Sequence, residues 1–130
     1  MEKIRIKLDF TTGPIWPEYY DEETDTESTG VDVVDKDDEL NKISKKISNM
    51  FNSYYIIDEK EGVSFNYEQE KKDKKLMLDL LNQLNKRLGE INDGSFTVVD
   101  KETPRVMKLW SMDYLLIIYR GIDATIRIGT

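Results

Sequence analysis

The stretch LMLDLLNQLNKRLGEI, at residues 76–91, decides the fold of this 130-residue chain. Four leucines recur every four residues, with three more apolar side chains beside them: Leu76, Leu80, Leu84 and Leu88, then Met77, Leu81 and Ile91. This spacing predicts an amphipathic helix with one apolar face. The pattern lasts only about two heptads, so we expect the helix to lie on a sheet rather than in a coiled coil. Asn92-Asp93-Gly94 ends it, because Gly and Asn readily adopt the left-handed conformation that follows a helix.

A second amphipathic helix is predicted upstream, where apolar positions again step by three and four: Leu40, Ile43, Ile47, Met50 or Phe51, and Tyr54. We expect Asp35 or Asp37 to cap its start, because a carboxylate accepts hydrogen bonds from the first free amides of a helix. Asp38 and Glu39 then stand in the first turn, where the helix dipole favours negative charge.

The remaining segments predict strands, hairpins and turns. Residues 1–10 and 122–128 alternate apolar and polar side chains, as in a strand with one buried face. Further strands are expected at these positions: 29–34, 54–58, 63–67, 95–100 and the continuously apolar 115–119. Residues 59–62 join two of them in a hairpin, and Asn66 is a candidate helix cap, with Ser64 or a start near Glu70 as alternatives. Residues 106–110 fit a helix or a strand equally.

These elements predict one α+β domain over residues 1–130, with two amphipathic helices packed on one largely antiparallel sheet. No segment predicts a membrane span or a signal peptide. The longest apolar run, residues 114–119, is far shorter than the ~20 residues that cross a bilayer. We therefore expect a cytoplasmic protein.

Two residue types with broad chemical use, cysteine and histidine, are missing from the chain. Their absence excludes disulfides, thiolate or imidazole metal sites, cysteine nucleophiles and the Ser–His–Asp triad. No Gly-rich phosphate loop follows a predicted strand, and no two carboxylates stand out as a matched acid and base. We expect no enzyme activity and no cofactor. A catalytic lysine with a lowered pKa is an alternative that the composition leaves open.

The negative charge of the chain is concentrated in one segment. The formal net charge is −7, from 19 basic and 26 acidic residues. Residues 17–39 hold eleven acidic residues and one lysine, a local charge of −10, whereas the rest of the chain carries 18 basic and 15 acidic residues, or +3. Such a segment, predicted as an acidic loop, steers a basic partner. The net charge opposes binding to phosphates, so we expect no direct contact with nucleic acid.

Four acidic residues of this segment occupy alternate positions, as calcium ligands do: Asp21, Glu23, Asp25 and Glu27. A calcium loop beginning at Asp21 would need Gly at its sixth position and Glu at its twelfth. The chain has Thr26 and Asp32 there. We therefore expect no metal site. A hydrolase that uses carboxylates and a metal is kept as the third functional alternative, after the two described below.

Aromatic residues lead directly into the acidic segment. Aromatic anchors surrounded by charge are typical of binding hot spots. We predict a partner-binding face formed by Trp16, Tyr19, Tyr20, Asp21, Glu22, Glu23, Asp25 and Glu27, extended by Asp35, Asp37 and Asp38. Two simpler interpretations stay open. In the first, the acidic segment serves only to keep the protein soluble. In the second, Trp16 packs at the end of the core and binds no partner.

Three stretches resemble immunity proteins of bacterial contact-dependent growth inhibition and related polymorphic toxin systems: IRIKLDFTTGPIWPEYY (4–20), STGVDVVD (28–35) and EINDGSF (90–96). The resemblance covers roughly residues 1–104. It implies a small cytoplasmic protein that binds the C-terminal domain of one cognate toxin and neutralises it. Such toxins are often nucleases, many of them directed at tRNA. An adaptor or structural domain with an acidic solubilising loop is the alternative.

Overall fold

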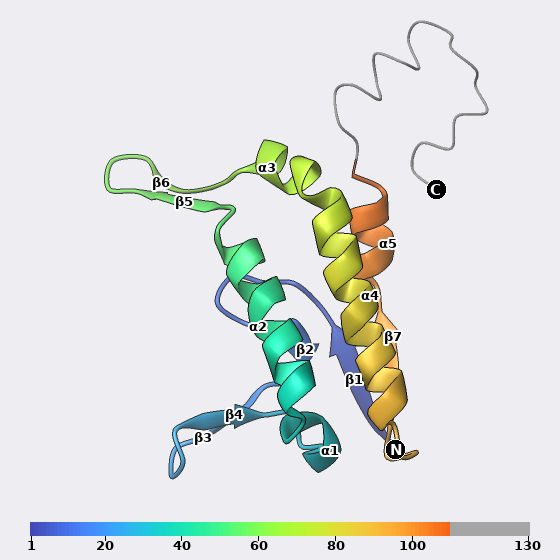
Figure 1. The fold of residues 1–130 in the computed structure, drawn as a ribbon. Helices are drawn as coiled ribbons and strands as arrows, with labels where there is room; N and C mark the ends of the chain where they lie inside the picture. Colours follow the sequence, from blue (N-terminus) through green and yellow to red (C-terminus); the bar gives the residue numbers. More distant parts are fainter. Residues whose placement is uncertain (110–130) are drawn as a thin grey trace, which may run out of the picture.

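In the computed structural model, two long helices lie against a small mixed sheet, and two hairpins extend from this body (Figure 1). The structure describes residues 1–109, so the strands predicted at 115–119 and 122–128 lie outside the described residues. The helices are α1 (Asp32–Asp35), α2 (Asp38–Asn52), α3 (Tyr67–Lys72), α4 (Lys74–Ile91) and α5 (Glu102–Met107). The strands are β1 (Glu2–Ile6), β2 (Ile15–Trp16), β3 (Tyr19–Asp21), β4 (Thr26–Ser28), β5 (Tyr55–Asp58), β6 (Gly62–Phe65) and β7 (Phe96–Asp100).

The central sheet has the strand order β2-β1-β7. β1 runs antiparallel to β2 and parallel to β7, with Ile4 beside Val98. The predicted α+β class agrees with this arrangement. The single, largely antiparallel sheet is not what forms: within residues 1–109 the strands make three separate small sheets, and one pair is parallel. A parallel pair needs a long crossover, and the helices between β1 and β7 provide it.

The core lies between this sheet and the two long helices. β1 contributes Ile4 and Ile6, and β7 contributes Phe96. Side chains from one face of each long helix complete the core: Leu40, Ile43, Ile47 and Phe51 from α2, and Met77, Leu81, Leu84 and Leu88 from α4. The α2 helix agrees with the sequence prediction, and of the two candidates Met50 and Phe51 it is Phe51 that is buried.

The buried face of α4 is rotated from the predicted one. Leu76 is 59% exposed and Leu80 is half-buried, whereas Met77 and Leu81 are buried. A strict step of four residues drifts about 40° around a helix at each repeat, because one turn takes only 3.6 residues. The set 77, 81, 84 and 88 mixes steps of four and three, so it stays on one face.

The strand expected at residues 29–34 is wrong, because residues 32–35 form the helical turn α1. The Asp35 carboxylate accepts hydrogen bonds from the Thr29 amide and the Thr29 hydroxyl, both at 2.8 Å. Val31 and Val34 are buried within this turn. Local hydrogen bonding to a side chain therefore outweighs the preference of valine for strands.

The predicted hairpin at residues 54–67 is confirmed as β5 and β6, which pair from Tyr55 and Phe65 at the base to Asp58 and Gly62 at the tip. The Asn66 cap is also confirmed, since its side chain accepts a hydrogen bond from the Gln69 amide at 3.1 Å. The helix that it begins is not continuous but divides into α3 and α4 at Asp73. Residues 106–107 belong to the helix α5. The sequence pattern of residues 106–110 had fitted a helix or a strand equally.

Asp37 caps α2 and also links it to α4. Its carboxylate accepts a hydrogen bond from the Leu40 amide at 2.8 Å. The Arg87 guanidinium donates to the same carboxylate twice, Nε to Oδ2 at 2.9 Å and Nη2 to Oδ1 at 2.6 Å. Arg87 holds the pKa of Asp37 below its ordinary value, chiefly through these hydrogen bonds. One carboxylate therefore fixes both the start of a helix and its packing.

Replacing Arg87 with Met should lower the free energy of unfolding by about 1–2 kcal/mol, because the partly buried Asp37 loses a charged hydrogen-bond partner. Urea denaturation at pH 7 measures this loss. A lowered pKa stabilises the fold above the ordinary pKa of the carboxyl group, and that contribution disappears as the pH falls through the folded-state value. The difference between the variant and the natural protein should therefore shrink in acid. Lys86→Met is the control, since Lys86 is exposed and joins no ion pair within residues 1–109; an equal loss there would contradict the assignment.

Candidate functional site

The acidic segment predicted as a loop contains a hairpin of its own. β3 and β4 pair in antiparallel fashion, with Tyr19 opposite Ser28 and Tyr20 opposite Glu27. We call residues 18–28 the acidic hairpin. It projects from the body beside α1 (Figure 1). The rest of the segment includes α1 and the first two residues of α2, with short connections between them.

The two tyrosines of the acidic hairpin are both 60% exposed. Neighbouring residues of a strand point to opposite faces, so Tyr19 and Tyr20 present one ring on each side of the hairpin. The Tyr20 hydroxyl donates a hydrogen bond to Asp25 Oδ1 at 2.5 Å, and this bond is the main reason that the pKa of Tyr20 is raised. Tyr20 is thereby tied to the turn at the tip.

The carboxylates at the tip point into solvent. The exposed acidic residues at the tip are Asp21, Glu22, Glu23 and Asp25; Glu27, farther along β4, is also exposed and lines the pocket at the hairpin base. The Asp21 carboxylate accepts a hydrogen bond from the Glu23 amide at 2.9 Å, which shapes the turn. None of the ion pairs found among residues 1–109 involves an acidic residue of this hairpin. Their charge is therefore available to an external cation.

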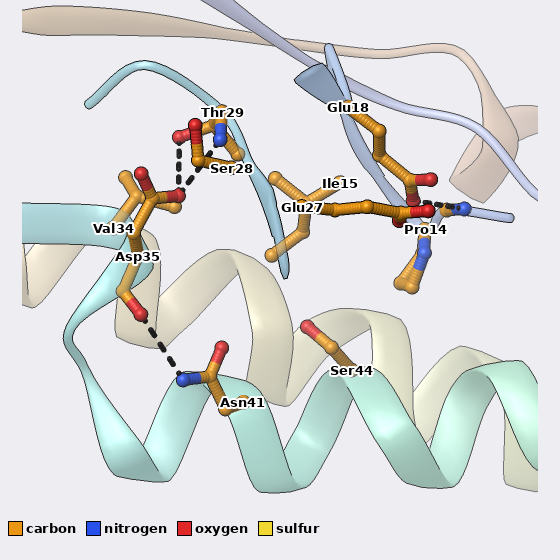
Figure 2. Close-up of a pocket in the computed structure, with 11 residues that line it drawn as sticks. Pro14, Ile15, Glu18, Glu27, Ser28, Thr29, Val34, Asp35, Asn41 and Ser44 are labelled. Carbon is orange, nitrogen blue, oxygen red and sulfur yellow. Dashed lines mark hydrogen bonds between the residues drawn. The ribbon is translucent and has the colours of Figure 1, made fainter. Parts of the chain in front are cut away.

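The base of the acidic hairpin closes a pocket of about 170 Å³ against α2. Figure 2 shows Glu18 and Glu27 reaching toward each other across it, with Ser44 projecting from α2. The Gly13 amide donates a hydrogen bond to Glu18. Burial raises the pKa of Glu18, and the nearby Glu27 carboxylate raises it further. Both carboxylates belong to the acidic hairpin, so it is the Gly13 hydrogen bond that ties the hairpin base to the body.

Trp16 lies apart from the two tyrosines. It belongs to β2, where its Nε1 donates to the Lys7 carbonyl oxygen at 3.0 Å. The Lys7 ammonium lies 5.8 Å from the centre of the Trp16 ring. The ring is half-buried in the central sheet. The structure therefore brings Tyr19 and Tyr20 together with the tip carboxylates, but not Trp16.

The three aspartates expected to extend the face have different surroundings. Asp35 is hydrogen-bonded to Thr29, and Asp37 to Leu40 and Arg87, so both charges serve contacts within the fold. Asp38 is exposed in the first turn of α2.

The sequence reasoning missed Glu18. The signal for it is the hairpin register, which places residue 18 on the same face as Tyr20 and Glu27 once β3 and β4 are recognised.

Within residues 1–109, no three acidic side chains gather in a way that would hold a metal ion. The helices in that part of the chain include none long and apolar enough to cross a membrane. Comparison with protein-family models, with curated proteins and with solved structures finds no match to this chain. The candidate site therefore rests on its own geometry: two exposed rings and a group of unpaired carboxylates on one projecting hairpin.

Replacing Glu18 with Gln should raise the melting temperature at pH 7 by roughly 2 °C, because the amide removes a charge that is partly buried beside Glu27. A carboxyl group whose pKa is raised on folding stabilises the protein while protonated, and this contribution is lost as the pH rises through the folded-state pKa. The gain should therefore vanish in acid, where Glu18 is already neutral. Thermal unfolding at several pH values measures it, with the exposed Glu22→Gln as control. A gain that is the same at every pH would contradict the carboxyl pair.

Proposed function

We propose that this chain is an immunity protein that binds the C-terminal domain of a cognate bacterial toxin, a basic nuclease, and blocks it by covering its basic surface. The observation that carries the proposal is the acidic hairpin, with two exposed tyrosines and five exposed carboxylates that form no ion pair within residues 1–109. The resemblance of residues 4–20, 28–35 and 90–96 to immunity proteins supports the same proposal.

Electrostatic attraction provides fast capture in this proposal. A nuclease carries a cationic surface for the phosphates of its substrate, and carboxylates seated on that surface exclude the substrate. Complementary fields raise association rates by up to ~10²–10³ at low salt. An antidote benefits from a fast encounter because a toxin that escapes it turns over many substrate molecules. Blocking by occlusion needs no nucleophile and no general base, in keeping with a chain that has no His and no Cys.

The tyrosines favour a particular binding geometry. Because Tyr19 and Tyr20 lie on opposite faces of a two-stranded hairpin, a flat partner surface would bury only one ring. A cleft that receives the hairpin edge-on buries both. A nuclease active site is such a cleft, lined with cations. We therefore propose that the hairpin enters the substrate cleft of the toxin, with the tip residues 21–25 leading.

The adaptor alternative, with an acidic loop that serves only solubility, is less well supported. Solubility is provided by charge, and exposed aromatic rings work against it. Tyr19 and Tyr20 are 60% exposed within the acidic hairpin. Growth rescue separates the two functions: cells that express the cognate toxin domain should survive when the chain is co-expressed and stop growing without it. Failure of rescue with a folded chain would contradict the immunity proposal.

The combined substitution Asp21→Asn, Glu22→Gln, Glu23→Gln and Asp25→Asn should slow association with the toxin domain at low salt by about tenfold or more, and should flatten its salt dependence. Stopped-flow mixing measures both. The matched control neutralises four exposed carboxylates elsewhere: Glu2→Gln, Glu59→Gln, Glu61→Gln and Asp79→Asn. Since both variants change the net charge equally, an equal loss of rate would mean that total charge, not the hairpin, steers the partner.

Truncation of either exposed ring, Tyr19→Ala or Tyr20→Ala, should raise the dissociation rate by about tenfold or more while leaving the association rate nearly unchanged, because buried aromatic anchors act on the formed complex. Surface plasmon resonance separates the two rates. Tyr67→Ala removes a ring that is 66% exposed outside the hairpin and serves as control. If only one of the two rings matters, the partner is flat at this point and the cleft geometry is wrong.

A further inference from the structure

The two faces of the central sheet differ in charge. The inner face of β1 carries Ile4 and Ile6, which are buried in the core. The outer face carries the alternate residues Lys3, Arg5 and Lys7, all of them exposed in the described part of the chain. The strand register places Lys3 next to Thr97 and Arg5 next to Val99 of β7, and Lys7 directly follows the last residue of β1. A row of cations therefore lines the side of the sheet that faces away from the core.

This row borders a groove of about 450 Å³, lined by Lys3, Arg5, Ile6, Lys7, Val99, Lys101 and Glu102. Its four cations form no ion pair with any carboxylate of residues 1–109. The one carboxylate in the lining, Glu102, already accepts a hydrogen bond from Arg105 Nε at 2.7 Å. The groove is thus cationic and lacks an internal counter-charge among the described residues.

The arrangement of these cations suits a regular polyanion. Alternate residues of a strand lie about 6.7 Å apart, which is similar to the spacing of successive phosphates in an extended single strand of nucleic acid. β7 pairs with the whole of β1, and β2 pairs with Arg5 and Ile6, so backbone groups are directed along the sheet and its outer face presents side chains. Recognition at this face therefore depends on side chains.

Trp16 lies beside this row of cations. It pairs with Arg5 across β1 and β2, which places both on the outer face. The hydrogen bond from its Nε1 to the Lys7 carbonyl oxygen fixes the ring edge. The ring is half-exposed and neighbours the Lys7 ammonium. A fixed aromatic ring next to a cationic track is the combination with which proteins hold single-stranded nucleic acid, the ring stacking on a base.

We propose that the outer face of the β2-β1-β7 sheet binds single-stranded nucleic acid, with Lys3, Arg5, Lys7 and Lys101 on the phosphates and Trp16 against a base. An acidic peptide fits less well, because its carboxylates alternate sides and it offers no base for the ring. This inference departs from the expectation drawn from the net charge. Eleven of the 26 acidic residues lie in residues 17–39, and none of these eleven lines the groove. It does not depend on the proposed function.

Fluorescence anisotropy with a labelled single-stranded oligonucleotide of about ten nucleotides, oligo-U and oligo-dT in parallel, tests the proposal on the full chain. Neutralisation of about four phosphates predicts a slope near −3 for the logarithm of the binding constant against that of the salt concentration. The variant with Lys3→Gln, Arg5→Gln, Lys7→Gln and Lys101→Gln should bind at least about tenfold more weakly. The matched control places the same charge change on exposed helix positions: Lys42→Gln, Lys45→Gln, Lys46→Gln and Lys75→Gln.

A second variant tests the ring apart from the charges. Trp16→Leu should weaken oligonucleotide binding severalfold and leave the binding of inorganic polyphosphate unchanged, because polyphosphate has no base to stack. Circular dichroism verifies that each variant is folded. The proposal is overturned if the natural chain does not bind the oligonucleotide at low salt, or if both charge variants lose affinity equally. Tighter binding of polyglutamate, of polyphosphate or of a duplex would also overturn it, in favour of an acidic protein, a simple polyanion or double-stranded nucleic acid.

Discussion

Burial of Ile4 and Ile6 beneath α2 and α4 is the contact on which the rest of the structure depends. A strand has only two faces, so the packing that places these isoleucines in the core also places Lys3, Arg5 and Lys7 on the outside. Nearly all of the large apolar side chains of α2 and α4 pack in this one core. Few apolar side chains of these helices are therefore left to pack against the acidic hairpin or the β5-β6 hairpin. Both therefore remain as projections, and the surfaces proposed for binding lie outside the packed body.

The acidic residues of the segment at 17–39 have two different roles, and their surroundings decide which. Asp35 and Asp37 stand next to amides, a hydroxyl or a guanidinium, and their carboxylates serve the fold because they accept hydrogen bonds from those donors. The carboxylates of residues 21–25 stand in a short turn, where the donors within reach are a backbone amide and the Tyr20 hydroxyl. Their charge stays directed toward solvent. Composition alone treats all of these residues alike, and the fold separates them.

The sequence predicted those features that depend on neighbours along the chain. The α2 helix, the β5-β6 hairpin and the Asn66 cap follow from spacing and from donor-acceptor pairs within a few residues. For the cap of α2 the sequence offered Asp35 or Asp37, and the structure has Asp37. The parallel pairing of β1 with β7 and the carboxyl pair of Glu18 with Glu27 depend on strand register, which no local pattern reveals. The sequence revealed the aromatic residues and tip carboxylates of the candidate site. It did not reveal that Trp16 lies in another sheet, opposite Arg5, because that position depends on the pairing of β2 with β1.

The position of the Glu18 and Glu27 pair has a consequence for the proposed complex. The pair lies at the base of the acidic hairpin, and burial together with mutual repulsion raises the pKa of Glu18. A basic partner that receives the hairpin in a cationic cleft brings positive charge toward Glu27, which lies on the exposed surface of β4 as well as beside the pocket. Positive charge nearby favours the ionised form of Glu18, so docking and proton release from Glu18 are linked in the same direction. The proposed binding would thus weaken in acid for a reason that lies in the hairpin base.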